Sequence, residues 1–194
     1  MEPQKPENIA LFDLDGTLCD YDSALFTGLN KLKSPDEPPI SLPITDESPE
    51  YLQERANLIR SSEIWWESLS RLKLGWDILQ VAKDLEFRIM ILTQGPRKNP
   101  AAWSGKKRWI DAHLGQDVDV TITRDKGLVY GKVLVDDFPG YISRWLEWRK
   151  RGLVIMPANK LNEGYSPKQV IRYNGTNLEI VRNAMRDAKH RAEE

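Results

Sequence analysis

The stretch Ile9-Ala10-Leu11-Phe12-Asp13-Leu14-Asp15-Gly16-Thr17-Leu18 decides how the rest of the chain is interpreted. Its first four residues are apolar and include a β-branched one, which predicts a short buried strand. Gly16 marks the point where the chain turns away from that strand. Asp13 and Asp15 are therefore expected at the carboxyl end of the strand, which is the edge of an open α/β sheet where ligands bind.

The pair of aspartates suits a bound cation. Carboxylates crowded at one point repel each other unless a cation lies between them, and Mg²⁺ is the hard, oxygen-preferring ion that fits best. Taken alone, Asp15-Gly16 is also compatible with an ordinary turn whose aspartates are solvated. The remainder of the chain has to distinguish these two interpretations.

Length and composition limit the protein class. A chain of 194 residues with 40% hydrophobic content can bury one substantial core, with room for an insertion. The formal net charge of -1 gives no general attraction to nucleic acid or to an anionic membrane, so we expect neither as a partner. The single cysteine, Cys19, excludes an intramolecular disulfide and a Cys-rich zinc site. Without a signal-like start or a long apolar run, the predicted location is cytoplasmic.

Helical and strand-like segments alternate along most of the chain. Residues 20–72 predict a small, mostly helical cap interrupted by a proline-rich loop at 34–49, and 1–19 with 73–194 predict an α/β core. Strands are expected at 87–92, 118–123, 132–135 and 153–156, and helices at 23–32 (capped by Ser23), 51–72, 76–85, 104–114, 141–150 and 177–194. Strands separated by helices imply a parallel sheet with right-handed crossovers.

Polar residues follow the predicted strands at one common edge. After Asp13 and Asp15 come Thr93, Lys126, and the Asp136-Asp137 pair. Because parallel strands place their carboxyl ends at one edge, these side chains are expected to converge although they are far apart in sequence. A carboxylate nucleophile, a second carboxyl as acid and base, a hydroxyl, an ammonium and further carboxylates for a cation form a complete set for phosphoryl transfer.

These motifs resemble a known enzyme superfamily. Four segments resemble, in order and spacing, the four motifs of the haloacid dehalogenase (HAD) superfamily of phosphatases. They are Phe12 to Leu18, Ile91 to Gly95, Lys126, and Val133 to Asp137. The stretches 123–126 and 134–137, with Trp66-Glu67, Lys106 and Trp109, more narrowly resemble the 5'(3')-deoxyribonucleotidase family. The resemblance implies a Rossmann-like HAD core whose small helical cap is inserted after the first strand.

The resemblance also implies roles for individual residues. Asp13 would be the nucleophile that forms an aspartyl-phosphate, and Asp15 the acid that protonates the leaving alkoxide and then activates water. Thr93 and Lys126 would hold phosphate oxygens, together with the amides of Gln94 and Gly95. Mg²⁺ would be held by Asp13, by the backbone carbonyl of Asp15 and by Asp137. Asp136 would then orient Lys126 or a metal-bound water, although either Asp136 or Asp137 is a candidate ligand.

Substrate contacts are predicted from the cap and from one strand end. By the resemblance, Tyr21, Trp65 and Trp66 are candidates to stack on a base, and since adjacent helical positions point about 100° apart, only one of the two tryptophans is expected to face the pocket. Arg124 fits either a substrate contact or a surface arginine. Gln94-Gly95 stands where the deoxyribonucleotidase family has a serine-proline pair, a departure that bears on base and sugar preference.

The resulting hypothesis is a Mg²⁺-dependent 5'-nucleotidase that acts on (deoxy)nucleoside monophosphates. A phosphatase of nucleic-acid 3' ends is a second hypothesis, and it would need a basic channel such as Arg97, Lys98, Lys106, Lys107 and Arg108 could form. A different small-metabolite phosphatase and a non-catalytic binding protein on the same fold are also compatible with the motifs. Trp145 and Trp148, three apart on one predicted helix, fit either the core or a dimer surface, which leaves an oligomer open.

Overall fold

The computed structural model describes residues 8–191, which form two compact units. Among these residues the first unit comprises 8–18, Leu72–Gln94 and 118–191, and the second comprises Cys19–Arg71 and Gly95–Asp117. The second unit is thus inserted into the first after Leu18 and again after Gln94. No helix among residues 8–191 is both long and apolar enough to cross a membrane.

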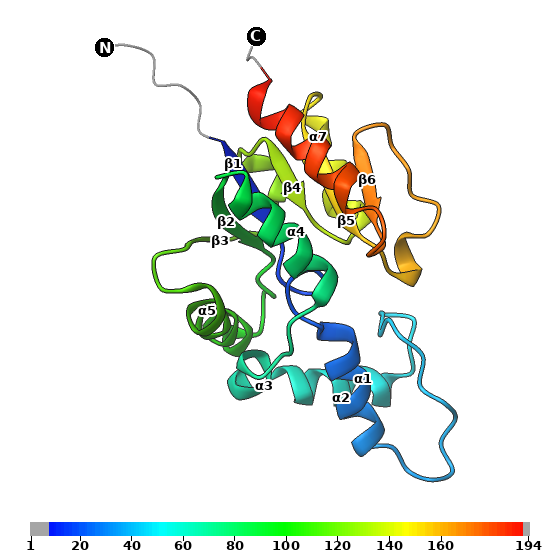
Figure 1. The fold of residues 1–194 in the computed structure, drawn as a ribbon. Coiled ribbons are helices and arrows are strands. Elements are labelled where there is room, and N and C mark those ends of the chain that lie inside the picture. Colours follow the sequence, from blue (N-terminus) through cyan, green and yellow to red (C-terminus); the bar gives the residue numbers. More distant parts are fainter. Residues whose placement is uncertain (1–7, 192–194) are drawn as a thin grey trace. The chain divides into compact units, whose positions relative to one another are not determined.

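The first unit is built on a parallel sheet with the strand order β3-β2-β1-β4-β5-β6 (Figure 1). The strands are β1 (Ile9–Phe12), β2 (Arg88–Thr93), β3 (Asp119–Ile122), β4 (Val133–Val135), β5 (Leu153–Pro157) and β6 (Val170–Tyr173). The predicted α/β class with a parallel sheet is confirmed. The strand β6 was not predicted. The charged residue Arg172 interrupts its apolar run, and of its four residues only Tyr173 is buried.

Helices cover both faces of this sheet. They are α4 (Lys73–Asp84), α6 (Pro139–Glu147) and α7 (Leu178–His190). The first unit also contains the short 3₁₀ helices η1 (Lys126–Leu128) and η2 (Lys160–Asn162). The connections β1 to β2 and β4 to β5 run in opposite directions along the sheet, so right-handed crossovers place α4 and α6 on opposite faces. α7 lies beside α4 (Figure 1), while Ile142 and Trp145 of α6 pack on Leu11, Leu134 and Val154.

The second unit is helical. Its helices are α1 (Tyr21–Lys31), α2 (Glu50–Arg60), α3 (Glu63–Glu67) and α5 (Pro100–Leu114). α1 packs on α2 through the buried residues Leu25, Leu29 and Ala56. The proline-rich stretch 34–49 contains neither helix nor strand, as predicted, and Arg55 of α2 holds it by a two-pronged ion pair with Glu37, at 2.6 and 2.7 Å.

The compact units differ from the predicted division at α5, which we expected in the core and which groups with the cap helices. The reason is close packing of α5 on α3. A Cβ on Gly105 would lie 2.5 Å from the Cβ of Trp66, so only glycine permits this approach. The indole of Trp109, fully buried, also donates to the carbonyl of Leu69 at 2.6 Å. Periodicity alone predicts that a helix forms, not which neighbour it packs on.

Several predicted boundaries were wrong for identifiable reasons. Ser23 does not cap α1, because the side chain of Asp20 accepts from the Ser23 amide instead. The single helix predicted at 51–72 breaks at Ser61, and Ser62 caps the new helix α3. Pro139 begins α6, two residues earlier than predicted. α7 ends at His190, and the last residues of its predicted range, 192–194, lie outside the described residues.

Candidate active site

Strand register brings the two aspartate motifs together at one sheet edge. Phe12 of β1 is paired with Val135 of β4, so the next residues along these strands, Asp13 and Asp136, are neighbours. The amide of Asp13 donates to the carbonyl of Val135 at 2.9 Å, which continues the pairing past the end of β1. The predicted convergence of these motifs is therefore present within the first unit.

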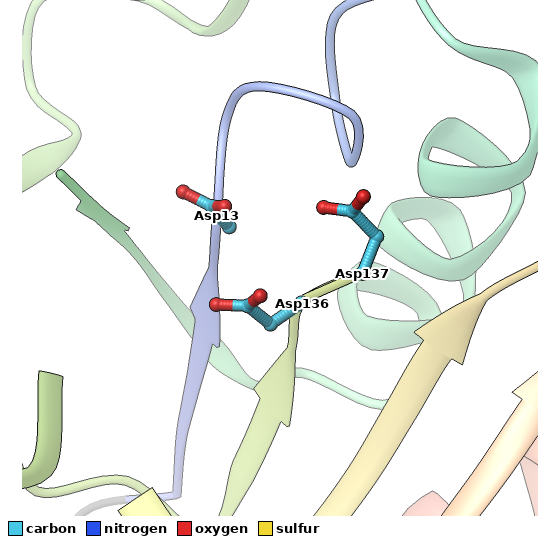
Figure 2. A group of neighbouring side chains, drawn as sticks. All are labelled: Asp13, Asp136 and Asp137. Atoms are coloured by element: carbon cyan, nitrogen blue, oxygen red, sulfur yellow. The ribbon is translucent and has the colours of Figure 1, made fainter. Parts of the chain in front are cut away.

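Three carboxyl groups gather at the ends of β1 and β4 (Figure 2). One carboxylate oxygen from each of Asp13, Asp136 and Asp137 lies within 4.8 Å of the others. Asp13 and Asp136 are buried, and Asp137 keeps some exposed surface. Negative charges held this close favour a cation between them, and an all-oxygen set of donors is the kind that Mg²⁺ prefers.

Lys126 provides a buried positive charge beside this cluster. Its Nζ lies 2.9 Å from Asp13 Oδ1 and 2.6 Å from Asp136 Oδ2, and the residue is 1% exposed. Burial by itself would lower the pKa of Lys126, but the charges of Asp13 and Asp136 outweigh it and raise that pKa. The lysine is therefore a permanent cation at neutral pH, held against the carboxylate that the sequence predicts as nucleophile.

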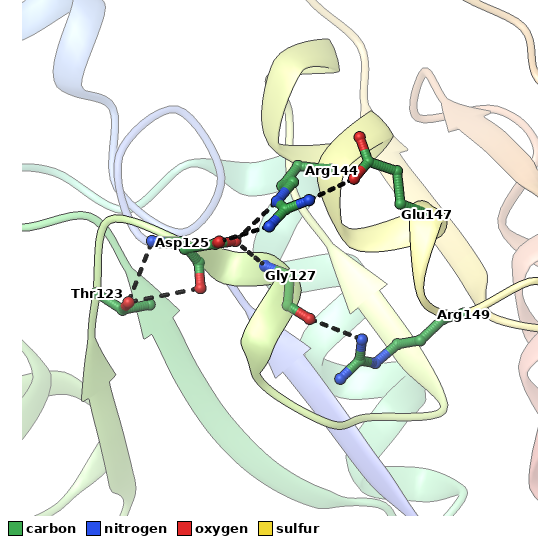
Figure 3. Close-up of polar contacts among 6 residues, drawn as sticks. All are labelled: Thr123, Asp125, Gly127, Arg144, Glu147 and Arg149. Carbon is green, nitrogen blue, oxygen red and sulfur yellow. Dashed lines mark hydrogen bonds and ion pairs between the residues drawn. The ribbon is translucent and has the colours of Figure 1, made fainter.

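A network of polar contacts holds the turn that carries Lys126 (Figure 3). The Asp125 side chain accepts from the amide of Gly127 at 3.0 Å, and Arg144 of α6 donates to both oxygens of Asp125 at 3.1 and 2.8 Å. Its hydrogen bond with Arg144 is the main cause that lowers the pKa of Asp125. From the other side, Arg149 donates to the Gly127 carbonyl at 2.8 Å. The turn is thus fixed on both flanks of Lys126.

The environment of Asp137 contains residues that sequence reasoning missed. Its Oδ2 accepts from Asn159 Nδ2 at 2.8 Å, and its Oδ1 accepts from Thr17 Oγ1 at 3.3 Å. Asn162 donates to the Asp137 backbone carbonyl at 3.0 Å. Asn159 follows β5 at the same sheet edge as the other motifs, and that position is the signal that could have found it.

Gly16 turns the chain tightly past Asp137. Its φ of +73° is a conformation that side chains other than glycine rarely adopt. A Cβ on Gly16 would also lie 2.6 Å from Asp137 Oδ2. The glycine after Asp15 is therefore more than a turn signal, because the second aspartate motif occupies the space that any side chain here would need.

Electrostatics support a cation at this cluster. Burial, opposed in part by Lys126, raises the pKa of Asp136 to about 6. Desolvation, and then the negative charges of Asp136 and Asp13, raise the pKa of Asp137 well above its ordinary value. One ammonium against three carboxyl groups leaves negative charge to be neutralised. The residues present therefore fit a divalent cation that prefers oxygen ligands.

The remaining predicted phosphate-binding residues occupy different places. Thr93, fully buried, ends β2, where its carbonyl accepts from the Thr123 amide at 3.0 Å. Gln94 follows it and accepts a hydrogen bond from the Tyr141 hydroxyl. Tyr141 was not predicted as a site residue, although its ring lies 4.5 Å from the Nζ of Lys126. Gly95 belongs to the second unit.

Two further predicted residues lie beside this group. Asp15 is half-buried and directly precedes Gly16. Arg124 is exposed, and its charge acts to lower the pKa of Tyr141, which burial raises overall. The positions of both residues are compatible with the roles predicted for them, which remain predictions.

The predicted base-stacking residues form one aromatic group within the second unit. Tyr21 stacks on Trp66 with a centroid distance of 5.6 Å, and Trp65 meets the edges of both rings. Trp66 is 3% exposed and donates through its indole to the Arg60 carbonyl at 2.7 Å, so its ring is committed to packing. Trp65 and Tyr21 are half-buried and keep exposed surface.

Three of the five basic residues considered as a nucleic-acid channel are engaged in local contacts, whereas Arg97 and Lys98 are exposed. Lys106 is 1% exposed, with its Nζ 5.1 Å from the ring centroid of Trp66. Lys107 pairs with Asp111, and Arg108 pairs with Glu63 at 2.6 Å. Lys106 is therefore withdrawn from a polyanion by burial, while Lys107 and Arg108 have their charges partly neutralised by carboxylates.

Comparison with known proteins finds similar sequences and similar structures. The human cytosolic-type 5'(3')-deoxyribonucleotidase is 28% identical over 140 residues, which cover 66% of this chain and 69% of that protein. A family IA, variant 3 HAD hydrolase from Entamoeba histolytica has a TM-score of 0.52 at 16% identity, covering 92% of this chain and 99% of that one. A proposed HAD-hydrolase from Bacillus subtilis, crystallised with magnesium, has a TM-score of 0.52 at 13% identity, covering 93% and 99%.

These likenesses define the class of protein. The chain has the fold of the HAD-like hydrolases, as the motif resemblance predicted. The human relative comes from the same family that the motifs resemble more narrowly. No model of a known protein family matches the chain.

Proposed function

We propose that the protein is a Mg²⁺-dependent phosphomonoesterase that works through an aspartyl-phosphate. The observation that carries this proposal is the group formed by Asp13, Asp136, Asp137 and Lys126, with three carboxyl groups within 4.8 Å and an ammonium 2.9 Å from Asp13. A carboxylate attacks a phosphate dianion only when the charge of that dianion is masked. The buried Lys126, together with a cation held by the carboxylates, would supply that masking.

The proposed reaction proceeds in two displacements at phosphorus. Asp13 attacks and forms a bond from its carboxylate oxygen to phosphorus, while the bond to the leaving oxygen breaks and Asp15 donates a proton to that oxygen. Asp15 then takes a proton from water as this water attacks the aspartyl-phosphate, which releases phosphate and regenerates Asp13. Thr93, Gln94, Gly95 and Lys126 hold the phosphate oxygens in this proposal.

The metal would be held by the side chains of Asp13 and Asp137 and by the backbone carbonyl of Asp15. When bound, Mg²⁺ supplies positive charge against the phosphate oxygens. Asp136 already accepts from Lys126 and from the Phe138 amide at 3.0 Å, so we assign it the role of orienting the lysine. The B. subtilis structure with this fold contains magnesium, which supports the choice of ion.

For the substrate we propose a (deoxy)nucleoside 5'-monophosphate. The human relative is a 5'(3')-deoxyribonucleotidase, and motifs of that family recur here on both sides of Lys126. Tyr21 and Trp65 keep exposed aromatic surface, and we assign the base contact to these two residues. Of the basic residues that a nucleic-acid 3'-end phosphatase would need as a channel, Lys106 is buried and Lys107 and Arg108 are ion-paired, so we keep that activity as the second candidate.

The test is phosphate release from a panel of phosphoesters with and without Mg²⁺. The panel contains ribo- and deoxynucleoside monophosphates, sugar phosphates, a 3'-phosphorylated oligonucleotide and p-nitrophenyl phosphate. We expect nucleoside monophosphates to be the preferred substrates, with no turnover after Mg²⁺ is removed. A preference for the oligonucleotide or for sugar phosphates would refute the nucleotidase assignment and leave the phosphatase assignment in place.

A matched pair of variants tests the base contact. Trp65→Ala should raise KM for nucleoside monophosphates about tenfold, because stacking on a base is worth about 1–3 kcal/mol, and leave p-nitrophenyl phosphate hydrolysis unchanged. The control is Trp103→Ala, which removes an exposed tryptophan of the same unit. Equal effects of the two variants on nucleotide KM would exclude Trp65 from the base contact.

A further inference from the structure

A cleft lies in the first unit, away from the carboxylate cluster. It has a volume of about 730 Å³, and its lining includes Lys132, which precedes β4, and Gly152, which precedes β5. Asp136, in contrast, directly follows β4. The cleft and the candidate active site therefore lie at opposite ends of the same strand, about 13 Å apart along it at about 3.3 Å per residue.

The cleft concentrates positive charge in a chain whose net charge is -1. Its charged lining residues are five cations and one carboxylate, namely Lys132, Arg149, Lys150, Arg151, Arg191 and Glu147. The carboxylate is paired with Arg144. Within the described residues, Lys132, Arg149, Lys150 and Arg191 have no ion pair with any carboxylate. This local excess of positive charge favours an anionic ligand.

Arg149 adds a specific feature to this charge. Its Nη1 donates to the Gly127 carbonyl (Figure 3), and its guanidinium lies over the ring of Trp145, 5.3 Å from the centroid. Its Nε is buried and has no hydrogen-bond acceptor among the described residues. A buried donor without an acceptor costs free energy, which an anion or a water held by an anion would recover.

Two exposed aromatic side chains line the same cleft. Trp148 is 67% exposed and Tyr130 is 44% exposed, whereas Trp145, three residues before Trp148, is fully buried. Large exposed aromatic rings beside unpaired cations suit a ligand that carries both a planar ring and negative charge. The volume lies within the range of small-molecule sites, about 300–1,000 Å³.

We propose that this cleft binds a small phosphorylated ligand with several negative charges and a planar aromatic ring, of the kind that a nucleoside triphosphate represents. The phosphates would be held by Lys132, Lys150 and Arg191, and the ring would stack on Trp148. This site is separate from the candidate active site and does not depend on the function proposed for it.

The test uses calorimetric titration of the full chain with ATP in the presence of EDTA. We expect ATP to bind, and the double variant Lys150→Gln/Arg191→Gln to weaken that binding about tenfold or more, because each cation makes charge-assisted contacts. The matched control is Lys83→Gln/Lys168→Gln, which removes two exposed lysines of the same unit and should change binding less than about twofold. Trp148→Ala should weaken ATP binding and leave inorganic triphosphate unaffected.

Three results would overturn the proposal. Undiminished ATP binding by the Lys150→Gln/Arg191→Gln variant would place the ATP elsewhere on the protein. A lower melting temperature of this variant with unchanged ATP binding would mean that these cations only complement the carboxyl ends of α6 and α7. Tighter binding of a single-stranded oligonucleotide than of ATP, lost in the same variant, would assign the cleft to nucleic acid instead.

Discussion

Replacement of Asn159 by serine isolates the contact that orients Asp137. The asparagine has two tasks, since its Nδ2 donates to Asp137 at 2.8 Å and its Oδ1 accepts from the amides of Leu161 and Asn162 at 2.9 and 3.0 Å. Serine retains an acceptor for these two amides and is an equally good residue at a helix start. Its hydroxyl is too short to replace the bond to Asp137.

The magnitude follows from the contacts of the Asp137 carboxylate. A hydrogen bond to a charged group contributes about 1.5–3 kcal/mol, and the second side-chain donor, Thr17 at 3.3 Å, has the longer and weaker bond. If the lost bond orients a metal ligand, Mg²⁺ affinity should fall about 10- to 100-fold, which is the usual effect of removing such a group. At saturating Mg²⁺ we expect kcat to change less than about threefold, because the Asn159 side chain is hydrogen-bonded to Asp137, Leu161 and Asn162 and to neither Asp13 nor Lys126.

The assay is a Mg²⁺ titration of phosphate release, repeated as calorimetry of Mg²⁺ binding. Asn183→Ser serves as the control, because Asn183 is an exposed residue of α7 in the same unit. The reasoning would be refuted if the Mg²⁺ concentration at half-saturation in Asn159→Ser stayed within about twofold of that in the unmodified protein. The bond would then contribute less than about 0.4 kcal/mol to metal binding.

Three more predictions follow from the same contacts. Lys126→Met should lower the rate of phosphate release by about 10²–10³-fold. It should also lower the free energy of unfolding by about 3–5 kcal/mol at neutral pH, because it leaves buried carboxylates without their partner. Urea denaturation that shows no loss of stability would contradict the ion-pair account. In the metal-free protein, burial raises the pKa of Asp136 to about 6 and raises the pKa of the proposed ligand Asp137 well above its ordinary value, so stability should fall as the pH rises through this range. Mg²⁺ should therefore raise the melting temperature more at about pH 7.5 than at about pH 5, because Asp137 must lose its proton to hold the metal; equal shifts would argue against Asp137 as a ligand. Trp145→Ala should lower the free energy of unfolding by about 3–5 kcal/mol and Trp148→Ala by less than about 0.5 kcal/mol, since the first is buried and the second is 67% exposed, and similar losses in both variants would show that Trp148 is packed in solution.

The sequence pattern predicted the elements that position the site better than it predicted their neighbours. The apolar run before Asp13 and the one before Asp136 are short buried strands, as expected for a parallel sheet covered on both faces. Which strands are adjacent is set by pairing between segments far apart in sequence. The pairing of Phe12 with Val135 therefore had to come from the structure.

Residues that support the site were harder to predict than residues that carry charge. Asn159 and Tyr141 contact the predicted machinery, but a lone asparagine after a strand or a tyrosine in a helix has no distinctive pattern. Trp145, which lies in α6, and Trp148, which is the C-cap residue of that helix, illustrate the same limit. Helical spacing left Trp145 and Trp148 equivalent, and only tertiary packing made one a core residue and the other a surface residue.

The central claim is that Asp13 performs phosphoryl transfer with help from Mg²⁺. The most direct measurement is phosphate release from p-nitrophenyl phosphate by the unmodified protein and by Asp13→Asn, each with Mg²⁺ and with EDTA. Asparagine keeps the size of the side chain and removes its nucleophilic oxygen, so we predict Mg²⁺-dependent turnover by the unmodified protein and a loss of at least about 10³-fold in the variant. Equal turnover by both proteins, or turnover unaffected by EDTA, would contradict the account.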